Sequence, residues 1–159
     1  MRFIHLFLTT LVLSVIISLI VLLECKSAEG QLLGDWDEVT WEYENSNTDD
    51  RMIDFEISQG QRSETFEKLI IYGGESWRFT NDYKMKLRLQ DGSYEDVKWK
   101  VKGRGNVLEL EHENLGSEKY QIQKISEDNL VIHFSSDAQH TGVVKMTLKR
   151  KLGKVYAKR

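Results

Sequence analysis

The stretch YKMKLRLQDGSYEDVKWKVK, residues 83–102, decides the fold class. In its first half apolar side chains alternate with cationic ones, and in its second half Val97, Trp99 and Val101 alternate with lysines. Side chains of a strand point to opposite faces in turn, so each half predicts a strand with one apolar face. Asp91-Gly92 between the halves is a typical hairpin turn, because glycine readily adopts a positive φ. The stretch therefore predicts two adjacent antiparallel strands.

The same alternation continues in both directions from this hairpin. Apolar and polar side chains alternate, between turn residues, over 39–43, 53–57, 77–79, 107–111, 120–122, 130–134 and 144–148. A chain of short strands with short connections is typical of all-β proteins. A meander with one apolar face per strand buries those faces by closing on itself, which also removes its edges. We therefore expect an all-β fold, a single antiparallel up-and-down β-barrel of about 8–10 strands.

Residues 63–72 fit two secondary structures. The spacing of Phe66, Leu69 and Ile70 fits a short helix, whereas the continuous apolar run over 69–72 fits a strand. The strand is the prediction made for this segment.

The N-terminal segment differs from the rest of the chain. Residues 3–23 carry no Asp, Glu, Lys or Arg, and Cys25 follows them directly after Glu24. This length suits an uncleaved membrane anchor, while a lone Cys at the end of an apolar run resembles a bacterial lipoprotein signal in which that Cys is lipidated. A cleaved secretory signal is the third reading. All three place the rest of the chain on the non-cytoplasmic side of a membrane, in the cell envelope.

These patterns divide the chain of 159 residues into four parts. Residues 1–25 are expected to be a signal peptide or membrane anchor, 26–33 a polar linker, 34–152 the barrel and 153–159 a basic C-terminal tail. The composition includes 6 Phe, 4 Trp and 6 Tyr, enough aromatic residues for one packed core. The single Cys excludes an internal disulfide and any multi-Cys metal site.

Four stretches of sequence resemble a known family. Gly34-Asp35-Trp36, at the start of the first predicted strand, resembles the Gly-x-Trp signature of the lipocalin superfamily. The stretches 77–83, 99–101 and 105–110 resemble the lipocalin-like domains that bacteria, in particular Bacteroidetes, carry on envelope lipoproteins. The resemblance covers roughly 32–151. It implies that Trp36 closes one barrel end beneath Arg150 from the last strand, and that the protein binds a small, mostly apolar molecule without catalysing a reaction.

The ligand-binding candidates are side chains on the predicted inner faces. Amphipathic aromatic side chains suit an apolar pocket with a few polar groups. The candidates are Trp41, Tyr43, Tyr83, Met85, Leu87, Trp99, Tyr120 and Phe134. The alternative is that they fill the core of a ligand-free barrel that contacts another envelope protein. An internal cavity of about 300 Å³ or more would favour the binding protein.

Other chemistry finds little support in the sequence. His112, His133 and His140 lie on separate elements, and Glu109, Glu111 and Glu113 share one strand face without a loop to wrap a cation. Gly-x-Ser-x-Gly, phosphate-loop and dinucleotide motifs are absent. We therefore expect neither an enzyme nor a bound metal or cofactor. The net charge of −3 makes nucleic acid an unsuitable partner, and the oligomeric state stays open.

Charge is distributed unevenly along the chain. Residues 35–67 hold 11 acids and 2 bases, whereas residues 145–159 hold 7 bases and no acid. The first and last strands of a closed barrel are neighbours, so these charges are expected to pair across the closure. The alternative for the basic tail is contact with an anionic membrane surface.

Overall fold

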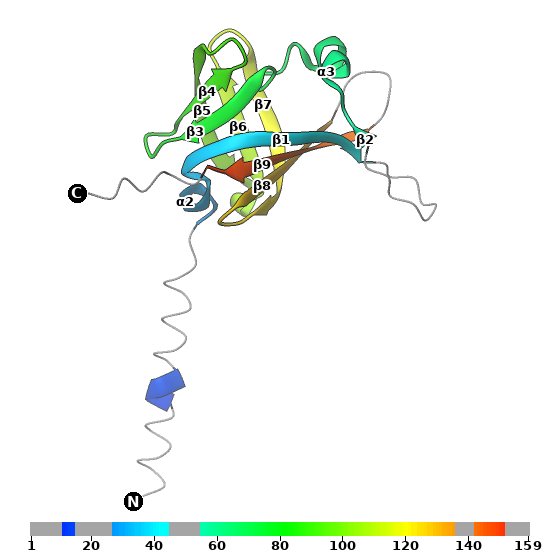
Figure 1. Ribbon diagram of the computed structural model, residues 1–159. Helices are drawn as coiled ribbons and strands as arrows, with labels where there is room; N and C mark the ends of the chain where they lie inside the picture. Colours follow the sequence, from blue (N-terminus) through cyan, green and yellow to red (C-terminus); the bar gives the residue numbers. More distant parts are fainter. Residues whose placement is uncertain (1–10, 15–26, 45–54, 136–141, 152–159) are drawn as a thin grey trace, which may run out of the picture.

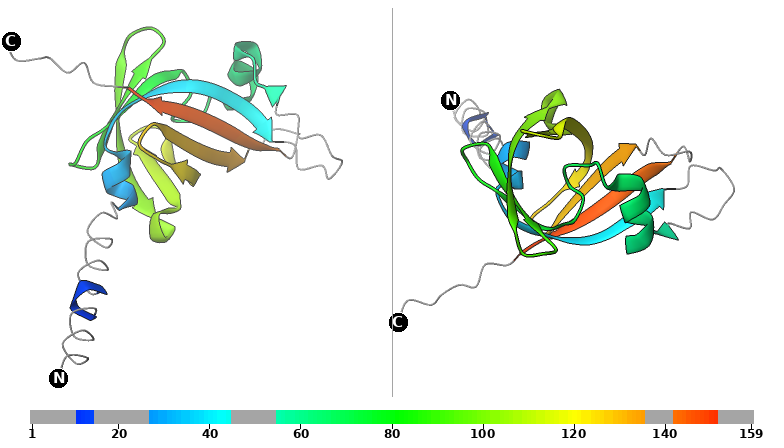
Figure 2. Two further views of the ribbon diagram at one scale, coloured as in Figure 1. Left: turned by 60° about the horizontal axis from the view of Figure 1, so that its bottom comes forward. Right: turned by 90° about the horizontal axis from the view of Figure 1, so that it is seen from above.

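The computed structural model describes residues 11–14, 27–44, 55–135 and 142–151. Within these residues nine strands form one antiparallel sheet: β1 (Gly34–Glu44), β2 (Phe55–Glu56), β3 (Gly74–Phe79), β4 (Lys84–Leu89), β5 (Tyr94–Lys102), β6 (Val107–His112), β7 (Gly116–Ile125), β8 (Asn129–Ser135) and β9 (Val143–Arg150). Because β1 pairs with both β3 and β9, all strands except the short β2 close into a barrel (Figures 1 and 2). The predicted up-and-down barrel is confirmed.

Two α-helices lie at opposite ends of this barrel. Helix α2 (Ala28–Leu32) contacts β5 and β7 beside the short 3-10 helix η1 (Gly103–Gly105), and we call this the closed end. Helix α3 (Gln59–Phe66) lies near the other end, with the β4–β5 and β6–β7 turns (Figure 1). We call this second end the mouth, and residues 67–73, which join α3 to β3, the mouth segment.

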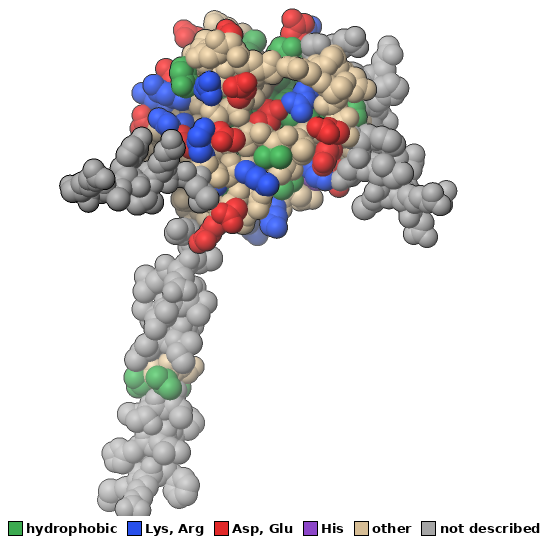
Figure 3. All heavy atoms as spheres, viewed as in Figure 1, with side chains coloured by type: hydrophobic (Ala, Val, Ile, Leu, Met, Phe, Trp, Pro, Cys, Tyr) green, Lys and Arg blue, Asp and Glu red, His purple; other side chains and the backbone are tan. Residues whose placement is uncertain are grey.

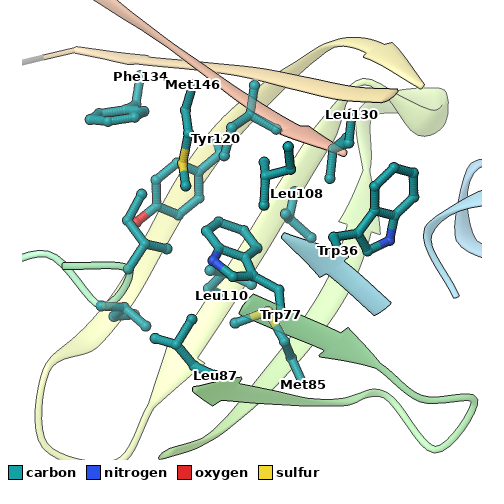
Figure 4. Close-up of a cluster of buried hydrophobic side chains, with 14 of the residues drawn as sticks. Trp36, Trp77, Met85, Leu87, Leu108, Leu110, Tyr120, Leu130, Phe134 and Met146 are labelled. Carbon is teal, nitrogen blue, oxygen red and sulfur yellow. The ribbon is translucent and has the colours of Figure 1, made fainter. Parts of the chain in front are cut away.

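The apolar faces of the strands point inward and form one core. Figure 4 shows side chains from strands on all sides of the barrel meeting in its interior. The inward-facing side chains in the stretch 83–102 include four that are at most 3% exposed, and they are Met85, Leu87, Val97 and Trp99. The predicted alternation of β4 and β5 is therefore confirmed.

Tyr83 is the exception to this alternation. It was predicted to face inward with Met85, yet its side chain is 58% exposed. Strand β4 begins only at Lys84, and Tyr83 lies in the preceding turn with a φ of 59°. The left-handed backbone directs its side chain away from the inner face, so the prediction for Tyr83 is wrong.

The closed end has the geometry that the Gly-x-Trp resemblance implied. Trp36 is fully buried, and its indole N–H donates to the Leu32 carbonyl at 2.7 Å. The Arg150 guanidinium carbon lies 4.0 Å from the centre of the Trp36 ring. Arg150 also donates to the carbonyls of Leu33 and Gln31, which ties the last strand to the entry of the first. The lipocalin-like fold predicted from the sequence is confirmed by this arrangement together with the closed barrel.

The same contacts correct the prediction for residues 26–33. A polar linker was expected, but Ala28–Leu32 form helix α2, which begins with a hydrogen bond from the Gly30 N–H to the Ser27 hydroxyl. Leu32 is fully buried in the core. Residues 27–33 therefore belong to the packed body and cover its closed end.

The strand expected within 63–72 is also wrong. Helix α3 ends at Phe66, and the mouth segment continues in turns, with the Leu69 N–H bonded to the Phe66 carbonyl. At the start of α3 the Gln61 side chain accepts a hydrogen bond from the Ser58 N–H, a local cap that favours helix. Ile70 and Ile71 of the continuous apolar run are buried in the barrel, where they form no strand.

The charged side chains of the first and last strands pair as predicted. Lys145 Nζ lies 2.7 Å from the Glu42 carboxylate, and Lys151 Nζ lies 3.3 Å from Asp37. Figure 3 shows acidic and basic side chains interspersed over the face seen in Figure 1. The tail of residues 153–159 lies outside the described residues, so its contact with a membrane surface stays a prediction.

The N-terminal segment is described only over residues 11–14, which are helical. Among the described residues, the helices are all too short or too polar to cross a membrane. Cys25 and most of residues 1–25 lie outside the described residues, and the signal or anchor stays a prediction.

A charged cluster on the outer wall predicts how stability depends on pH. Glu109 contacts both Lys102 and Lys100, and mainly the hydrogen bond from Lys102 lowers the pKa of Glu109 from 4.5 to about 2. A carboxyl with a lowered pKa in the folded state stabilises the fold above its unfolded-state pKa, and this contribution is lost as the pH falls. We expect Glu109→Gln to reduce the loss of thermal stability between about pH 4.5 and pH 2. Thermal unfolding followed by circular dichroism measures this.

The matched control is Glu111→Gln. Glu111 lies on the same face of β6 but is exposed, so its replacement should leave the acid dependence unchanged. An acid dependence of Glu109→Gln that equals that of the wild type would contradict the assignment.

Candidate ligand-binding site at the barrel mouth

An aromatic cluster lies inside the mouth. The rings of Trp41 and Phe66 are 5.5 Å apart, those of Trp41 and Phe134 5.4 Å, and those of Tyr120 and Phe134 5.5 Å. Tyr43 is half-buried and completes the cluster against Phe66 at 6.4 Å. Edge-to-face pairs of this kind hold one another in place and present apolar faces to whatever lies between them. We call Trp41, Tyr43, Phe66, Tyr120 and Phe134 the mouth cluster.

A bulge in β1 brings Trp41 into this cluster. The pairing of β1 with β9 shifts between Glu38 and Thr40, so one additional residue enters the strand. Strict alternation from Trp36 would direct Trp41 outward, because the two are an odd number of positions apart. The bulge restores the inward direction, and both tryptophans are at most 1% exposed.

One side of the mouth carries an ion pair. The Arg62 guanidinium of α3 contacts the Glu38 carboxylate of β1, donates to the Ile57 carbonyl, and lies 5.0 Å from the centre of the Trp41 ring. Glu38 pairs with buried Leu148 across the β1–β9 ladder and so faces inward. Burial raises the pKa of the Glu38 carboxyl, an effect that the neighbouring Trp41 and Arg62 oppose. Arg62 thus attaches α3 to β1, and its positive charge is paired with the Glu38 carboxylate.

The opposite side of the mouth carries a second carboxylate, Glu118. It lies across from buried Leu110 in the β6–β7 ladder, so it points into the barrel. Its two oxygens accept hydrogen bonds from the Ile70 N–H at 3.2 and 3.1 Å, and it accepts another from the Tyr120 hydroxyl. Burial, followed by the charge of Glu118, raises the pKa of Tyr120, so the phenol is neutral and donates. Glu118 therefore holds the mouth segment in place from inside the barrel.

The mouth segment fills the space above the cluster. Ile70 and Ile71 are at most 1% exposed, while Leu69 and Tyr72 are partly buried beside them. Because it lacks regular secondary structure and joins α3 to β3, its attachment depends on these apolar contacts and on the bonds to Glu118. Displacing this segment would therefore break these contacts and no strand ladder.

Two buried indole donors in the core have no acceptor. Among the described residues, the indole N–H groups of Trp77 and of Trp41 are buried without a hydrogen-bond partner. Figure 4 shows the Trp77 ring in the middle of the core, with its nitrogen on the side of Tyr120. An unpaired buried donor costs about 1–3 kcal/mol, so a bound molecule with an acceptor could stabilise the fold by meeting it.

The predicted ligand-binding residues fall into two groups. Trp41, Tyr43, Tyr120 and Phe134 lie together in the mouth cluster. The other four lie on β4, on β5 or in the turn before β4, and they are Tyr83, Met85, Leu87 and Trp99. The Trp99 ring packs on the rings of Phe79 and Tyr83. The structure therefore does not bring all eight into one site.

Tyr83 and Trp99 of the second group border a separate hollow, while Met85 and Leu87 are fully buried in the core. The hollow has a volume of about 420 Å³ and is lined by Asp82, Tyr83, Lys84, Lys98, Trp99, Lys100, Glu109 and Glu111. The lysines and Glu109 and Glu111 alternate with buried inward residues of their strands, so this hollow opens on the outer wall. Its charges balance, with three cations and three anions, and single out no ligand class.

The histidines and acids of the described residues form no metal centre. Within 27–44, 55–135 and 142–151, no three His, Cys, Asp or Glu side chains gather to hold an ion. His112 accepts the N–H groups of Asn114 and Leu115 and lies by Glu95, and His133 lies 3.4 Å from Glu44. His140 lies outside the described residues.

Several residues of the mouth and of the core beside it were not among the predicted candidates: Glu38, Arg62, Phe66, Ile70, Ile71, Trp77 and Glu118. Glu118 had a signal in the sequence, since it shares its parity with Tyr120 and Ile122 and so places an acid on an apolar face. The pair Ser58 and Gln61 was a helix-cap signal for α3. The contact of the mouth segment with Glu118 joins residues far apart in the chain and had no sequence signal.

No family model and no curated protein matches the chain. Solved structures with some similarity include a lipocalin-like protein from Bacteroides uniformis, with 11% identity over 77% of this chain and 100% of that one, at a TM-score of 0.46. An uncharacterized protein from Bacteroides eggerthii shows 8% identity over 75% of this chain and 98% of that one, at 0.45.

Bovine odorant-binding protein, solved in complex with undecanal, is also similar. It shows 19% identity over 81% of this chain and 76% of that chain, at a TM-score of 0.41. The lipocalin-like fold of the present chain rests on its own barrel closure and on the Trp36–Arg150 contact, rather than on these similarities.

Proposed function

We propose that this protein binds a small lipophilic or amphipathic molecule inside its barrel, without catalysing a reaction, and that the molecule enters through the mouth. The observation that carries the proposal is the Trp77 N–H, a buried donor without an acceptor, which lies on the side of Tyr120 in an aromatic cluster that the mouth segment covers. A closed β-barrel supplies the rigid apolar wall that such a site needs.

Entry requires the mouth segment to move. Its bonds to Glu118 and the burial of Ile70 and Ile71 oppose this movement, while burial of an apolar ligand and satisfaction of Trp77 favour it. The ligand thereby takes the space that the two isoleucines occupy in the closed state. Tight edge-to-face packing in the mouth cluster favours the alternative, a ligand-free barrel that contacts another envelope protein.

Binding of the apolar probe N-phenyl-1-naphthylamine separates these functions. We expect the full-length chain in lipid nanodiscs to bind the probe at micromolar concentration, about −8 kcal/mol, and to unfold at a higher temperature in its presence. Energy transfer from tryptophan to the probe measures binding, and empty nanodiscs correct for partition into lipid.

Two tryptophan variants locate the probe. Trp77→Phe should lower the energy transfer, with Trp41 of the mouth cluster remaining as a donor, whereas Trp99→Phe, which changes a ring beside the outer hollow, should lower it less. If the reverse holds, the probe lies in the outer hollow. If no apolar probe binds below about 100 µM, the packed interaction barrel is the better description.

We further propose that the barrel is tethered to a membrane of the cell envelope through residues 1–25. The support is the uncharged stretch 3–23 followed by Cys25 in the sequence. Metabolic labelling with a fatty-acid analogue should mark the wild-type chain and fail on Cys25→Ser if the tether is a lipid on that residue. Labelling of neither chain, with both in the membrane fraction, would instead indicate a helical anchor.

A further inference from the structure

The polar groups of the mouth constrain what kind of head group a ligand can carry. Glu38 and Glu118 are both inward-facing carboxylates, on β1 and β7. Arg62 contacts Glu38 alone of the two, and it also donates to the Ile57 carbonyl. These three charged groups of the mouth therefore carry a net negative charge.

Opening the mouth leaves a specific acceptor unpaired. When the mouth segment moves, Glu118 loses the Ile70 N–H, which both of its oxygens accept in the closed state. The Tyr120 hydroxyl continues to donate to one of these oxygens and keeps the carboxylate in its orientation. Loss of a donor from a partly buried carboxylate is costly, so a bound molecule is favoured if it donates a hydrogen bond in place of Ile70.

From this geometry we infer that Glu118 selects an amphiphile whose head group is a hydrogen-bond donor, an alcohol or an amine, over one whose head group is a carboxylate. The inference rests on the proposed function and adds the ligand class to it. The donor head group replaces the Ile70 N–H at Glu118, and the alkyl chain lies against the mouth cluster. A carboxylate head group would instead lie beside Glu118 as a like charge and would donate no hydrogen bond to it.

A set of matched amphiphiles tests the inference. Decanol, decylamine and decanoic acid share one chain length and compete with N-phenyl-1-naphthylamine for the full-length protein in nanodiscs at pH 7.5. We expect the alcohol and the amine each to displace the probe at concentrations at least about tenfold lower than the acid, a preference of about 1.4 kcal/mol. Equal potency of the acid and either donor would overturn the inference.

Variants assign the preference to one carboxylate. Glu118→Gln keeps the shape of the side chain and removes its charge, so the preference should fall to within about threefold while the probe still binds. Glu111→Gln makes the same change of charge on the outer wall of the adjacent strand and should leave the preference at the wild-type ratio. Tyr120→Phe should retain the preference, because the carboxylate remains. A preference that persists in Glu118→Gln, or that Glu111→Gln removes, would overturn the assignment to Glu118.

The outcomes separate the two proposals. If the probe binds and the three amphiphiles displace it with equal potency, the selection by Glu118 is contradicted. The proposed binding function is not affected by this result. Failure of the wild type to bind the probe contradicts the binding function, and the head-group selection falls with it. Near-ultraviolet circular dichroism of each variant confirms that it is folded before the competition is measured.

Discussion

Replacing Trp36 with alanine should lower the free energy of unfolding by about 3–5 kcal/mol, as large-to-small changes in a core do. Trp36 is fully buried, donates a 2.7 Å hydrogen bond to the Leu32 carbonyl and lies beneath Arg150 at 4.0 Å. The change removes the largest side chain at the closed end and leaves both partners exposed to a cavity. Urea unfolding followed by circular dichroism measures the loss.

Two further variants show which contacts carry this effect. Trp36→Phe keeps an aromatic ring beneath Arg150 and should recover more than half of the lost stability. Tyr94→Ala removes an aromatic side chain that is 66% exposed, so it should change stability by less than about 0.5 kcal/mol. A loss below about 1 kcal/mol in Trp36→Ala would show that the closed end does not depend on the Gly-x-Trp signature.

Much of the barrel could be predicted because alternation is local. Met85, Leu87 and Trp99 face the core as their spacing required, and Glu42 pairs with Lys145 as the charge distribution required. These features depend on strand parity and on which strands are neighbours in a closed meander. Tyr83 departs from the pattern because a single left-handed residue before β4 changes the direction of its side chain.

The candidate site was harder to predict because its contacts join distant segments. The 69–72 run has strand-like composition, yet its isoleucines cover the mouth in turns, since the barrel is already closed by β1 and β9 and leaves them no ladder to join. Glu118 meets Ile70 across 48 positions of sequence, and Arg62 meets Glu38 across 24. Alternation shows that Glu118 faces inward, but it does not show what it contacts there.

Phe66 offers the sharpest test of whether the mouth is an entrance. Its ring is 3% exposed and contacts Trp41 and Phe134, so Phe66→Ala should lower the free energy of unfolding by about 3–5 kcal/mol. Phe79→Ala is the matched control, because Phe79 is 2% exposed and packs on Trp77 and Trp99, and its described ring contacts include no ring of the mouth cluster. Both variants should lose similar stability in urea.

The two variants should differ once an apolar probe is present. In Phe66→Ala the cavity lies among the mouth cluster, so a ligand enters without first displacing a ring, and we expect N-phenyl-1-naphthylamine to bind about tenfold more tightly than to the wild type. A saturating probe concentration should therefore restore about 1.4 kcal/mol more stability to Phe66→Ala than the wild type gains, since a ligand of the folded state stabilises it by mass action. Phe79→Ala should gain no more than the wild type does. Equal gains in all three proteins would mean that removing Phe66 opens no route to the interior, and the mouth cluster would then be core packing alone.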